Sequence, residues 1–360
     1  MNPSRIQQDA VYVVGVGAQT PVGRNALSAA AAVRCGISAY AEHPFMIDKY
    51  GEPMVVARAE WLDEVMSVQD RILQLGLSAS LDALAPWIKT GKSLTLNVVL
   101  SLSSENLAQE ELRSEIARRF TTGLNAEGIS PRCQIVCDGN AAGTQAMLVA
   151  CQSIRKSPDE LCLVVGVDSH LGPEQLDLLD YSGRLHSVNN SWGFTPGEAA
   201  GVCLLASGRG VGRFQLRPLA EVQAISMASE NKLLGTKTVC IGEGLSSAFR
   251  GVLNKDELVN HSYCDLNGET YRADEFGFAV CRTSQYFQDA SNFTAAAECW
   301  GDVGTASAPL QVALATSAWA RGYAKGPVAL AWCCRPQPRL SGTLYWSGEK
   351  AIWRRTLAGI

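Results

Sequence analysis

Residues 134–156 decide the fold, and they read QIVCDGNAAGTQAMLVACQSIRK. The first four residues, Gln134 to Cys137, form a short run typical of a strand. The segment 141–156 is typical of a helix, because it places an apolar stripe on one face: Ala146, Met147, Ala150 and Ile154. Asn140 therefore stands at the turn between a strand and a helix.

This stretch resembles the nucleophile region of the β-ketoacyl synthases. DGNAAGTQA at 138–146 is followed by Ile154-Arg155-Lys156 and by VVGVDS at 164–169. In that family a short strand ends in Ala-Cys-Ala-Ser-Gly and a helix begins there. By this resemblance Asn140 occupies the position of the nucleophilic cysteine.

Further segments are similar to the family in the same order along the chain. They are VVGVGAQTPVG at 13–23, RCGIS at 34–38, GFTPGEAAGV at 193–202, AEV at 220–222 and GEG at 242–244. The resemblance implies an α/β, thiolase-like fold in which two similar βαβ-rich halves form α-β-α-β-α layers. We expect the N-terminal half to span residues 1–206 and the C-terminal half residues 207–360.

Two other family motifs are recognisable by position but lack their chemistry. LNGETYRAD at 266–274 resembles the His-Gly-Thr-Gly-Thr segment, with Leu266 in place of histidine. WGDVGTAS at 300–307 resembles the Gly-His segment, with Asp302 in place of the second histidine and Ala297 in place of the nearby lysine. The two histidines stabilise a thioester oxyanion in the family. Leu266 cannot donate a hydrogen bond, and an ionised Asp302 would oppose the negative charge.

Asn140 also has no thiol with which to form an acyl-enzyme. We expect its side chain to cap the following helix, since asparagine is among the best N-cap residues. Cys137 is an alternative, displaced nucleophile, but the pattern places it within the strand and away from the helix start. Asn140, Leu266 and Asp302 are expected to line a remnant pocket, in which Asn140, Asp302 and Phe194 are candidate binding residues.

Composition favours an ordinary globular protein. The chain of 360 residues has 47% hydrophobic and 18% charged residues and a net charge of −4, which gives no electrostatic case for binding nucleic acid. The polar start of the chain and the short apolar runs predict a cytoplasmic protein without a membrane span. The twelve cysteines lie mostly in apolar runs and show no zinc-site spacing, so we expect reduced core thiols, no metal and no cofactor.

The remaining pattern predicts alternating strands and helices. Strands are expected at 11–17, 96–102, 133–137, 161–167, 200–206, 217–224, 260–265, 327–333 and 342–346, and helices at 24–34, 67–83, 105–120, 141–156, 242–253 and 305–321. Residues 170–192 are expected to form an altered pocket lid. His43, His170, His186 and His261 are scattered in sequence, and an ordinary solvated or core role is expected for each.

The resemblance implies a homodimer in which residues 134–137 pair with their symmetry mate. The loss of three catalytic groups favours a pseudoenzyme, acting as an adaptor or chaperone for a protein partner. The Gly-Asp-Val-Gly segment at 301–304 is similar to degenerate proteins encoded among bacterial type VI secretion effector genes, which makes effector loading one such role. Two alternatives stay open: an inactive partner subunit of an active ketosynthase, working with an acyl carrier protein, and a residual enzyme that acts on acyl thioesters, such as a decarboxylase or an acyltransferase.

Overall fold

The strand predicted before Asn140 is the end of β5 (Ile129–Cys137), at one edge of a five-stranded half-sheet. The computed structural model describes residues 7–91, 93–104, 107–137, 139–232, 238–334 and 340–348. The half-sheet has the order β1-β7-β6-β4-β5. Its other strands are β1 (Val11–Gln19), β4 (Leu94–Leu102), β6 (Leu161–Ser169) and β7 (Glu198–Ser207).

A second five-stranded half repeats this pattern in the order β8-β12-β11-β9-β10. Its strands are β8 (Ala220–Ser229), β9 (His261–Cys264), β10 (Phe293–Ala295), β11 (Val328–Cys334) and β12 (Leu340–Gly348). In each half the first two neighbouring pairs are antiparallel and the next two are parallel. The halves join where residues 11–13 of β1 pair with residues 220–222 of β8. The predicted boundary between residues 206 and 207 falls at the end of β7.

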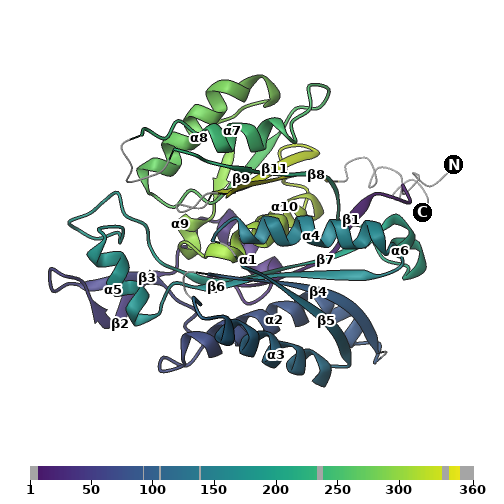
Figure 1. Ribbon diagram of the computed structural model, residues 1–360, viewed down its shortest axis with the longest axis horizontal. Helices are drawn as coiled ribbons and strands as arrows, with labels where there is room; N and C mark the ends of the chain where they lie inside the picture. The colour runs from purple at the N-terminus through teal and green to yellow at the C-terminus, as the bar shows by residue number, and fades with distance from the viewer. Residues whose placement is uncertain are drawn as a thin grey trace.

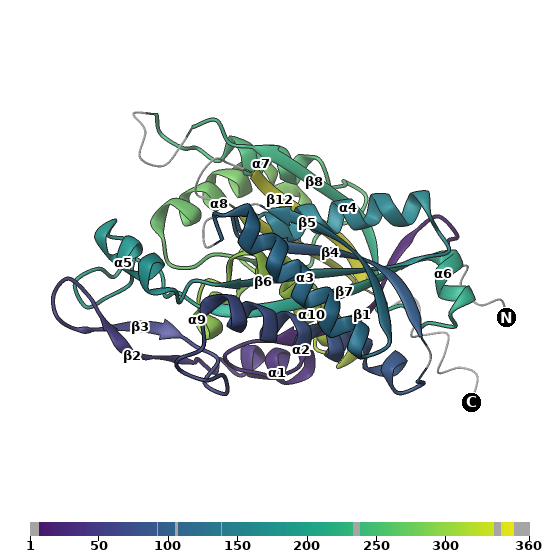
Figure 2. The ribbon, with the colours of Figure 1, turned by 60° about the horizontal axis from the view of Figure 1, so that its bottom comes forward.

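Helices form three layers around the two half-sheets (Figure 1). The middle layer holds α1 (Ala26–Arg34), α4 (Ala142–Lys156) and α10 (Ser307–Ala320). On the outer face of the N-terminal half lie α2 (Val68–Ile88) and α3 (Glu110–Ala126), which come forward in Figure 2. On the outer face of the C-terminal half lie α7 (Glu243–Arg250) and α8 (Thr270–Thr283). This α-β-α-β-α stacking confirms the predicted fold class.

The layered arrangement explains which strands and helices are fully buried. Every residue of β6, β7 and β11 is buried, because helices cover both faces of these strands. Residues 307–318 of α10 are buried on all sides, since the helix lies between the two half-sheets. The described part of the chain contains no helix that is both long and apolar enough to cross a bilayer.

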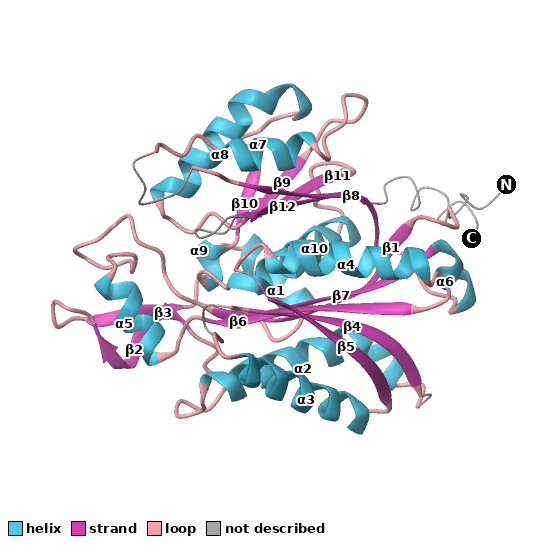
Figure 3. Ribbon diagram, in the orientation of Figure 1, coloured by secondary structure: helices cyan, strands magenta, loops and turns pink. Residues whose placement is uncertain are grey.

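Several shorter elements were not predicted from the sequence (Figure 3). They are β2 (Tyr40–Ile47), β3 (Pro53–Ala57), α5 (Pro173–Tyr181), α6 (Gly208–Arg213), η1 (Ser284–Tyr286), β10 and α9 (Ala297–Trp300), and the longer α8 was not predicted either. The short η2 (Gly304–Ala306) lies at the start of the helix predicted at 305–321. β2 and β3 form a hairpin, and β3 meets residue 197 through an isolated bridge. The helix expected at 105–120 begins at residue 110, and residues 105 and 106 lie outside the described part.

Candidate functional site

The candidate site lies where the starts of α4 and α10 meet between the half-sheets. Asn140 precedes Ala141, the N-cap residue of α4, and Asp302 precedes the short η2 helix that leads into α10. Gly143 permits the close approach, because a Cβ there would lie 2.6 Å from the Thr305 carbonyl oxygen. The duplicated fold therefore brings together two residues that lie far apart in the sequence.

Asn140 does not cap α4, so that prediction is wrong. The N-cap residue is Ala141, whose side chain makes no capping hydrogen bond. The Asn140 side chain instead crosses between the halves, where its Nδ2 donates to Asp302 Oδ1 at 3.0 Å. Both residues are buried, each with 5% of its surface exposed. A buried carboxylate is stabilised by hydrogen-bond donors, so the Asn140 amide donates to Asp302 instead of capping α4.

The Asp302 carboxylate accepts hydrogen bonds on both oxygens. Besides Asn140, Oδ1 accepts from the Gly304 backbone N–H at 2.9 Å. Oδ2 accepts from Asn267 Nδ2 at 2.8 Å and from Arg272 Nη2 at 3.1 Å. Burial opposes ionisation of Asp302, but Arg272, His170 and the Gly304 and Asn267 donors outweigh it and hold its pKa below the usual range. Asp302 is therefore an ionised carboxylate in the interior.

Arg272 joins this carboxylate to a second one. Its side chain is 1% exposed, and Nη1 donates to Asp265 Oδ2 at 2.6 Å. The Asp265 Oδ2 atom also accepts from the Cys334 backbone N–H at 2.9 Å. Burial raises the pKa of Asp265 to about 6, although Arg272 lowers it. One guanidinium thus stands between two buried carboxylates, and Asp302 has the lower pKa of the two because His170, Gly304 and Asn267 also favour its charge.

The network continues toward the surface. Asn267 Nδ2 also donates to Glu269 Oε2 at 3.1 Å. Glu269 receives both arms of Arg184, from Nε to Oε1 at 2.7 Å and from Nη2 to Oε2 at 2.9 Å. We call the set Asn140, Asp265, Asn267, Glu269, Arg272, Asp302 and Arg184 the buried polar network.

His170 lies beside the buried polar network, although its place in the sequence did not suggest this. Its Nε2 is 3.8 Å from Asp302 Oδ1, and its ring meets the Phe194 ring edge-on at 6.1 Å. Phe194 is buried at 3% exposure. His170 directly follows β6, and the carboxyl ends of parallel strands converge on one edge of a sheet. The position of His170 at the carboxyl end of a parallel strand could therefore have placed it near the candidate site.

An open cavity of about 640 Å³ adjoins the buried polar network. Its wall is formed by Tyr40, His186, Ser191, Trp192, Gly193, Thr195, Leu266, Asn267, Gly268, Glu269, Thr270, Ala273, Asp274, Phe293, Ala295 and Glu298. Leu266 lines this cavity, as expected of a pocket residue. Asn140, Asp302 and Phe194 are buried and are not among the lining residues, contrary to the expectation that Asn140 and Asp302 line the pocket with Leu266. Residues 186, 191 and 192 of the predicted lid form part of the wall.

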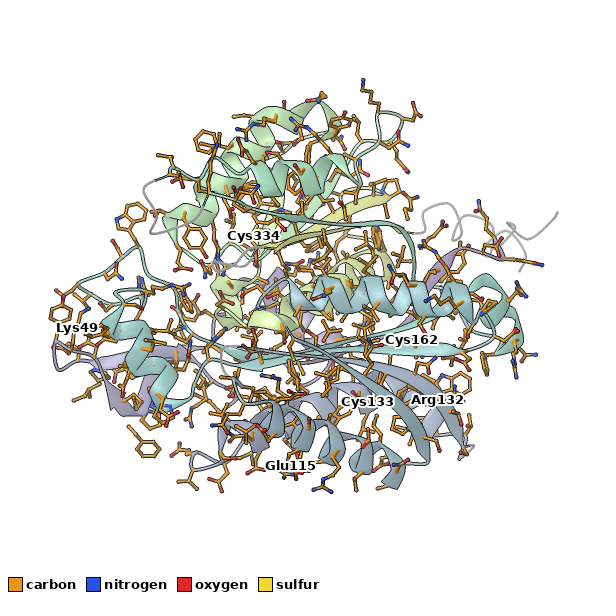
Figure 4. The ribbon with its side chains drawn as sticks, viewed as in Figure 1. Lys49, Glu115, Arg132, Cys133, Cys162 and Cys334 are labelled. Carbon is orange, nitrogen blue, oxygen red and sulfur yellow. The ribbon has the colours of Figure 1, made fainter. Side chains whose placement is uncertain are left out.

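Cys137 does not resemble an activated nucleophile. It lies at the end of β5 with an exposed side chain. Partial burial raises the pKa of its thiol, whereas a reactive cysteine has a lowered pKa. None of the twelve cysteines forms a disulfide, and Cys162 and Cys334 are buried in β6 and β11, as Figure 4 shows with Cys133 on β5.

One group of potential metal ligands lies in the C-terminal half, away from Asn140. Side-chain atoms of Glu230, Cys240 and Glu275 lie within 4.8 Å of one another. Glu230 accepts from the backbone N–H groups of Lys232 at 3.0 Å and of Gly244 at 2.9 Å, so it holds the start of α7. Burial raises the pKa of Glu275 to about 7 and that of Cys240 to about 12, which keeps the thiol protonated.

Comparisons with known proteins agree with this architecture. Residues 90–209 match the model of the beta-ketoacyl synthase N-terminal domain. No curated protein matches the chain by sequence. The ishigamide ketosynthase/chain length factor superposes with a TM-score of 0.74 at 16% identity, covering 95% of this chain and all of that one.

Two other solved structures are similar to the chain. The ketosynthase from module 6 of the bacillaene synthase of Bacillus subtilis 168 has a TM-score of 0.73 at 13% identity, over 95% of this chain and 72% of its own. A type II polyketide synthase ketosynthase, in complex with its acyl-carrier protein, has a TM-score of 0.71 at 13% identity, over 95% of this chain and 100% of its own. The chain therefore has the thiolase-like fold of the ketosynthases.

Proposed function

We propose that this chain is a noncatalytic, ketosynthase-like protein that acts by binding protein partners. The observation that carries the proposal is the hydrogen bond from Asn140 Nδ2 to Asp302 Oδ1 within the buried polar network. By the sequence resemblance, these two residues stand where the family has its nucleophile and an oxyanion-binding histidine. Here they bind each other.

The chemistry of these groups does not suit acyl transfer. The Asn140 amide is not a nucleophile for a thioester. The donors that converge on Asp302 already serve a full negative charge, so they are not available to a developing oxyanion. Leu266, at the position of the other histidine, offers no polar atom. A condensation mechanism would need a nucleophile and free hydrogen-bond donors. In this site Asn140 is no nucleophile, and the donors are already bound to Asp302.

The same proposal includes a homodimer formed through β5. β5 ends the strand order of the sheet, and β4 is its neighbour among the described strands. Pro131 suits an edge position, because proline cannot donate to a ladder. An edge strand exposes backbone groups that a symmetry mate can pair with. Residues 134–137 lie at the end of this edge nearest the candidate site.

The dimer is tested by light scattering. Ile135 is four residues from Pro131 in a ladder without a register shift, so its backbone N–H faces the same outer edge, and Ile135→Pro should convert the dimer to a monomer by removing that N–H. Ile135→Val keeps that N–H and serves as the matched control. A wild-type protein that is monomeric at micromolar concentration would contradict this part of the proposal.

An adaptor that loads type VI secretion effectors is the role we propose for such a dimer. The support is the sequence similarity at residues 301–304 together with a scaffold retained around a site without a nucleophile. A second candidate, the partner subunit of an active ketosynthase, is favoured by the similarity to the ishigamide ketosynthase/chain length factor. Co-expression with each candidate partner, followed by affinity purification, separates the two: a stable complex with an effector supports the adaptor, and one with a ketosynthase supports the subunit.

Turnover tests the noncatalytic proposal directly. The purified protein is incubated with malonyl-CoA and with malonyl-loaded acyl carrier protein, and free thiol and carbon dioxide are measured. We expect release equal to that without protein, in wild type and Asn140→Ala alike. Release that depends on Asn140 would establish a residual enzyme instead.

A further inference from the structure

The cavity beside the buried polar network has an acidic and aromatic wall. Its charged lining residues are Glu269, Asp274 and Glu298. Glu269 is paired with Arg184, whereas Asp274 and Glu298 form no ion pair among the described residues. The lining contains no lysine or arginine within that same part of the chain. Within the described residues, the cavity therefore presents the uncompensated negative charge of Asp274 and Glu298 to an occupant.

Three aromatic rings in the wall are accessible from solvent. Trp192 is 69% exposed, Tyr40 is 40% exposed and Phe293 is 38% exposed. Two of them are held in place: the Tyr40 hydroxyl donates to the Ala297 carbonyl at 2.6 Å, and the Phe293 ring packs edge-on against Phe276 at 5.6 Å. The rings come from segments far apart in the sequence, so the fold assembles them.

Carboxylates combined with aromatic faces favour a cation. A guanidinium or ammonium group gains from both the negative charge and the ring quadrupoles. The same wall disfavours an anionic occupant, such as an arm that carries a phosphodiester. The apolar surfaces of Leu266 and Ala295 suit the methylene stem of a basic side chain.

We propose that this cavity binds a lysine or arginine side chain presented by a segment of a partner protein. The inference rests on the proposed function, because it assigns the chemistry of the partner to the cavity next to the inactive site. The cavity has room for more than one side chain, so neighbouring apolar residues of the segment enter with the basic one. Arginine is favoured over lysine, since it stacks on aromatic rings and binds carboxylates with two donors.

The test uses a fluorescein-labelled hexapeptide that contains two arginines, and a counterpart in which citrulline replaces both. Binding is followed by fluorescence anisotropy. We expect the arginine peptide to bind at least tenfold more tightly than the citrulline peptide, and this preference to shrink as salt is raised. Equal binding of the two peptides, or none of either, would overturn the inference.

Matched variants locate the site. Asp274→Asn and Glu298→Gln should each weaken binding of the arginine peptide by about three- to tenfold, because each removes one charge contact at a solvent-exposed surface. Trp192→Leu keeps an apolar side chain but removes the ring, and should weaken it by about twofold to fivefold. Glu111→Gln removes an exposed carboxylate from α3, on the far outer layer, and should leave binding unchanged. An equal loss in Glu111→Gln would show that the peptide binds through overall charge.

The outcomes for the two proposals remain distinct. Absence of the arginine preference in a protein that does not turn over malonyl thioesters would refute this inference and leave the noncatalytic function in place. Turnover of malonyl thioesters would refute the noncatalytic function, whichever peptide binds.

Discussion

Removal of the Arg272 guanidinium is the perturbation for which the structure gives the clearest magnitude. Arg272→Met keeps the length of the side chain and leaves Asp265 and Asp302 buried without their shared cation. Breaking a buried ion pair from one side costs about 3–5 kcal/mol. With about 2 cal/mol/K of unfolding entropy per residue, this corresponds in a chain of 360 residues to a fall in Tm of about 4–7 °C.

The assay is urea unfolding followed by tryptophan fluorescence at pH 7. Arg250→Met, at the exposed end of α7, is the control and should change the free energy of unfolding by less than about 0.5 kcal/mol. The triple change Arg272→Met, Asp265→Asn and Asp302→Asn should recover part of the loss, because no unpaired charge remains. If Arg272→Met were as stable as Arg250→Met, the account of the buried polar network would be wrong.

The pH dependence of this deficit follows from the two carboxylates. In the wild type, the lowered pKa of Asp302 contributes stability above the ordinary carboxyl pKa, and that contribution is lost as pH falls through the lowered value. Asp265 acts in the opposite direction: its pKa of about 6 means that stability is lost as pH rises through 6. Without Arg272 the pKa values of both carboxylates should be raised, as that of Asp265 is. The loss in the free energy of unfolding of Arg272→Met, relative to the wild type, should therefore become smaller as the pH falls from 7 to 5.

Three further substitutions test the geometry around Asn140. Asn140→Ala should cost about 1 kcal/mol in the free energy of unfolding, because one hydrogen bond to Asp302 is lost, and far-ultraviolet circular dichroism should show no loss of helix. Asn140→Cys should react with iodoacetamide more slowly than exposed Cys35, since burial and the Asp302 charge both raise a thiol pKa; faster alkylation would show that the helix start dominates. Gly304→Ala should lower stability by at least about 2 kcal/mol in urea, because φ is +52° and a Cβ would overlap the Asp168 carboxylate; a neutral effect would place the start of α10 elsewhere.

The architecture could be predicted because local pattern and motif order agree. The long apolar strands β6, β7 and β11 lie under helices on both faces, so they appear in the sequence as continuous apolar runs. The helix α8 could not be predicted because its buried face includes the charged residues Arg272 and Glu275, which interrupt the apolar periodicity of a helix. The hairpin β2–β3 was missed because the side chains of β2 are mostly exposed and β3 is too short to show a clear alternation.

The candidate site could be predicted only in part. Asn140 and Asp302 were identified through the positions of missing catalytic groups, and the structure brings them into contact. Arg272 was not identified, because arginine is rarely buried and sequence alone gives no sign of two carboxylate partners. The cap predicted for Asn140 rested on local propensity, and a nonlocal carboxylate overrode it.

Intact-mass spectrometry tests the central claim most directly. The protein is incubated with acetyl-CoA, octanoyl-CoA and octanoyl-loaded acyl carrier protein, and an active ketosynthase serves as the positive control. Because Asn140 is bound to Asp302 and Cys137 is not activated, we predict an unchanged mass for this chain and an acyl adduct on the control. A stable acyl adduct that peptide mapping assigns to Cys137 would contradict the account, since it would show that the fold has kept a working nucleophile.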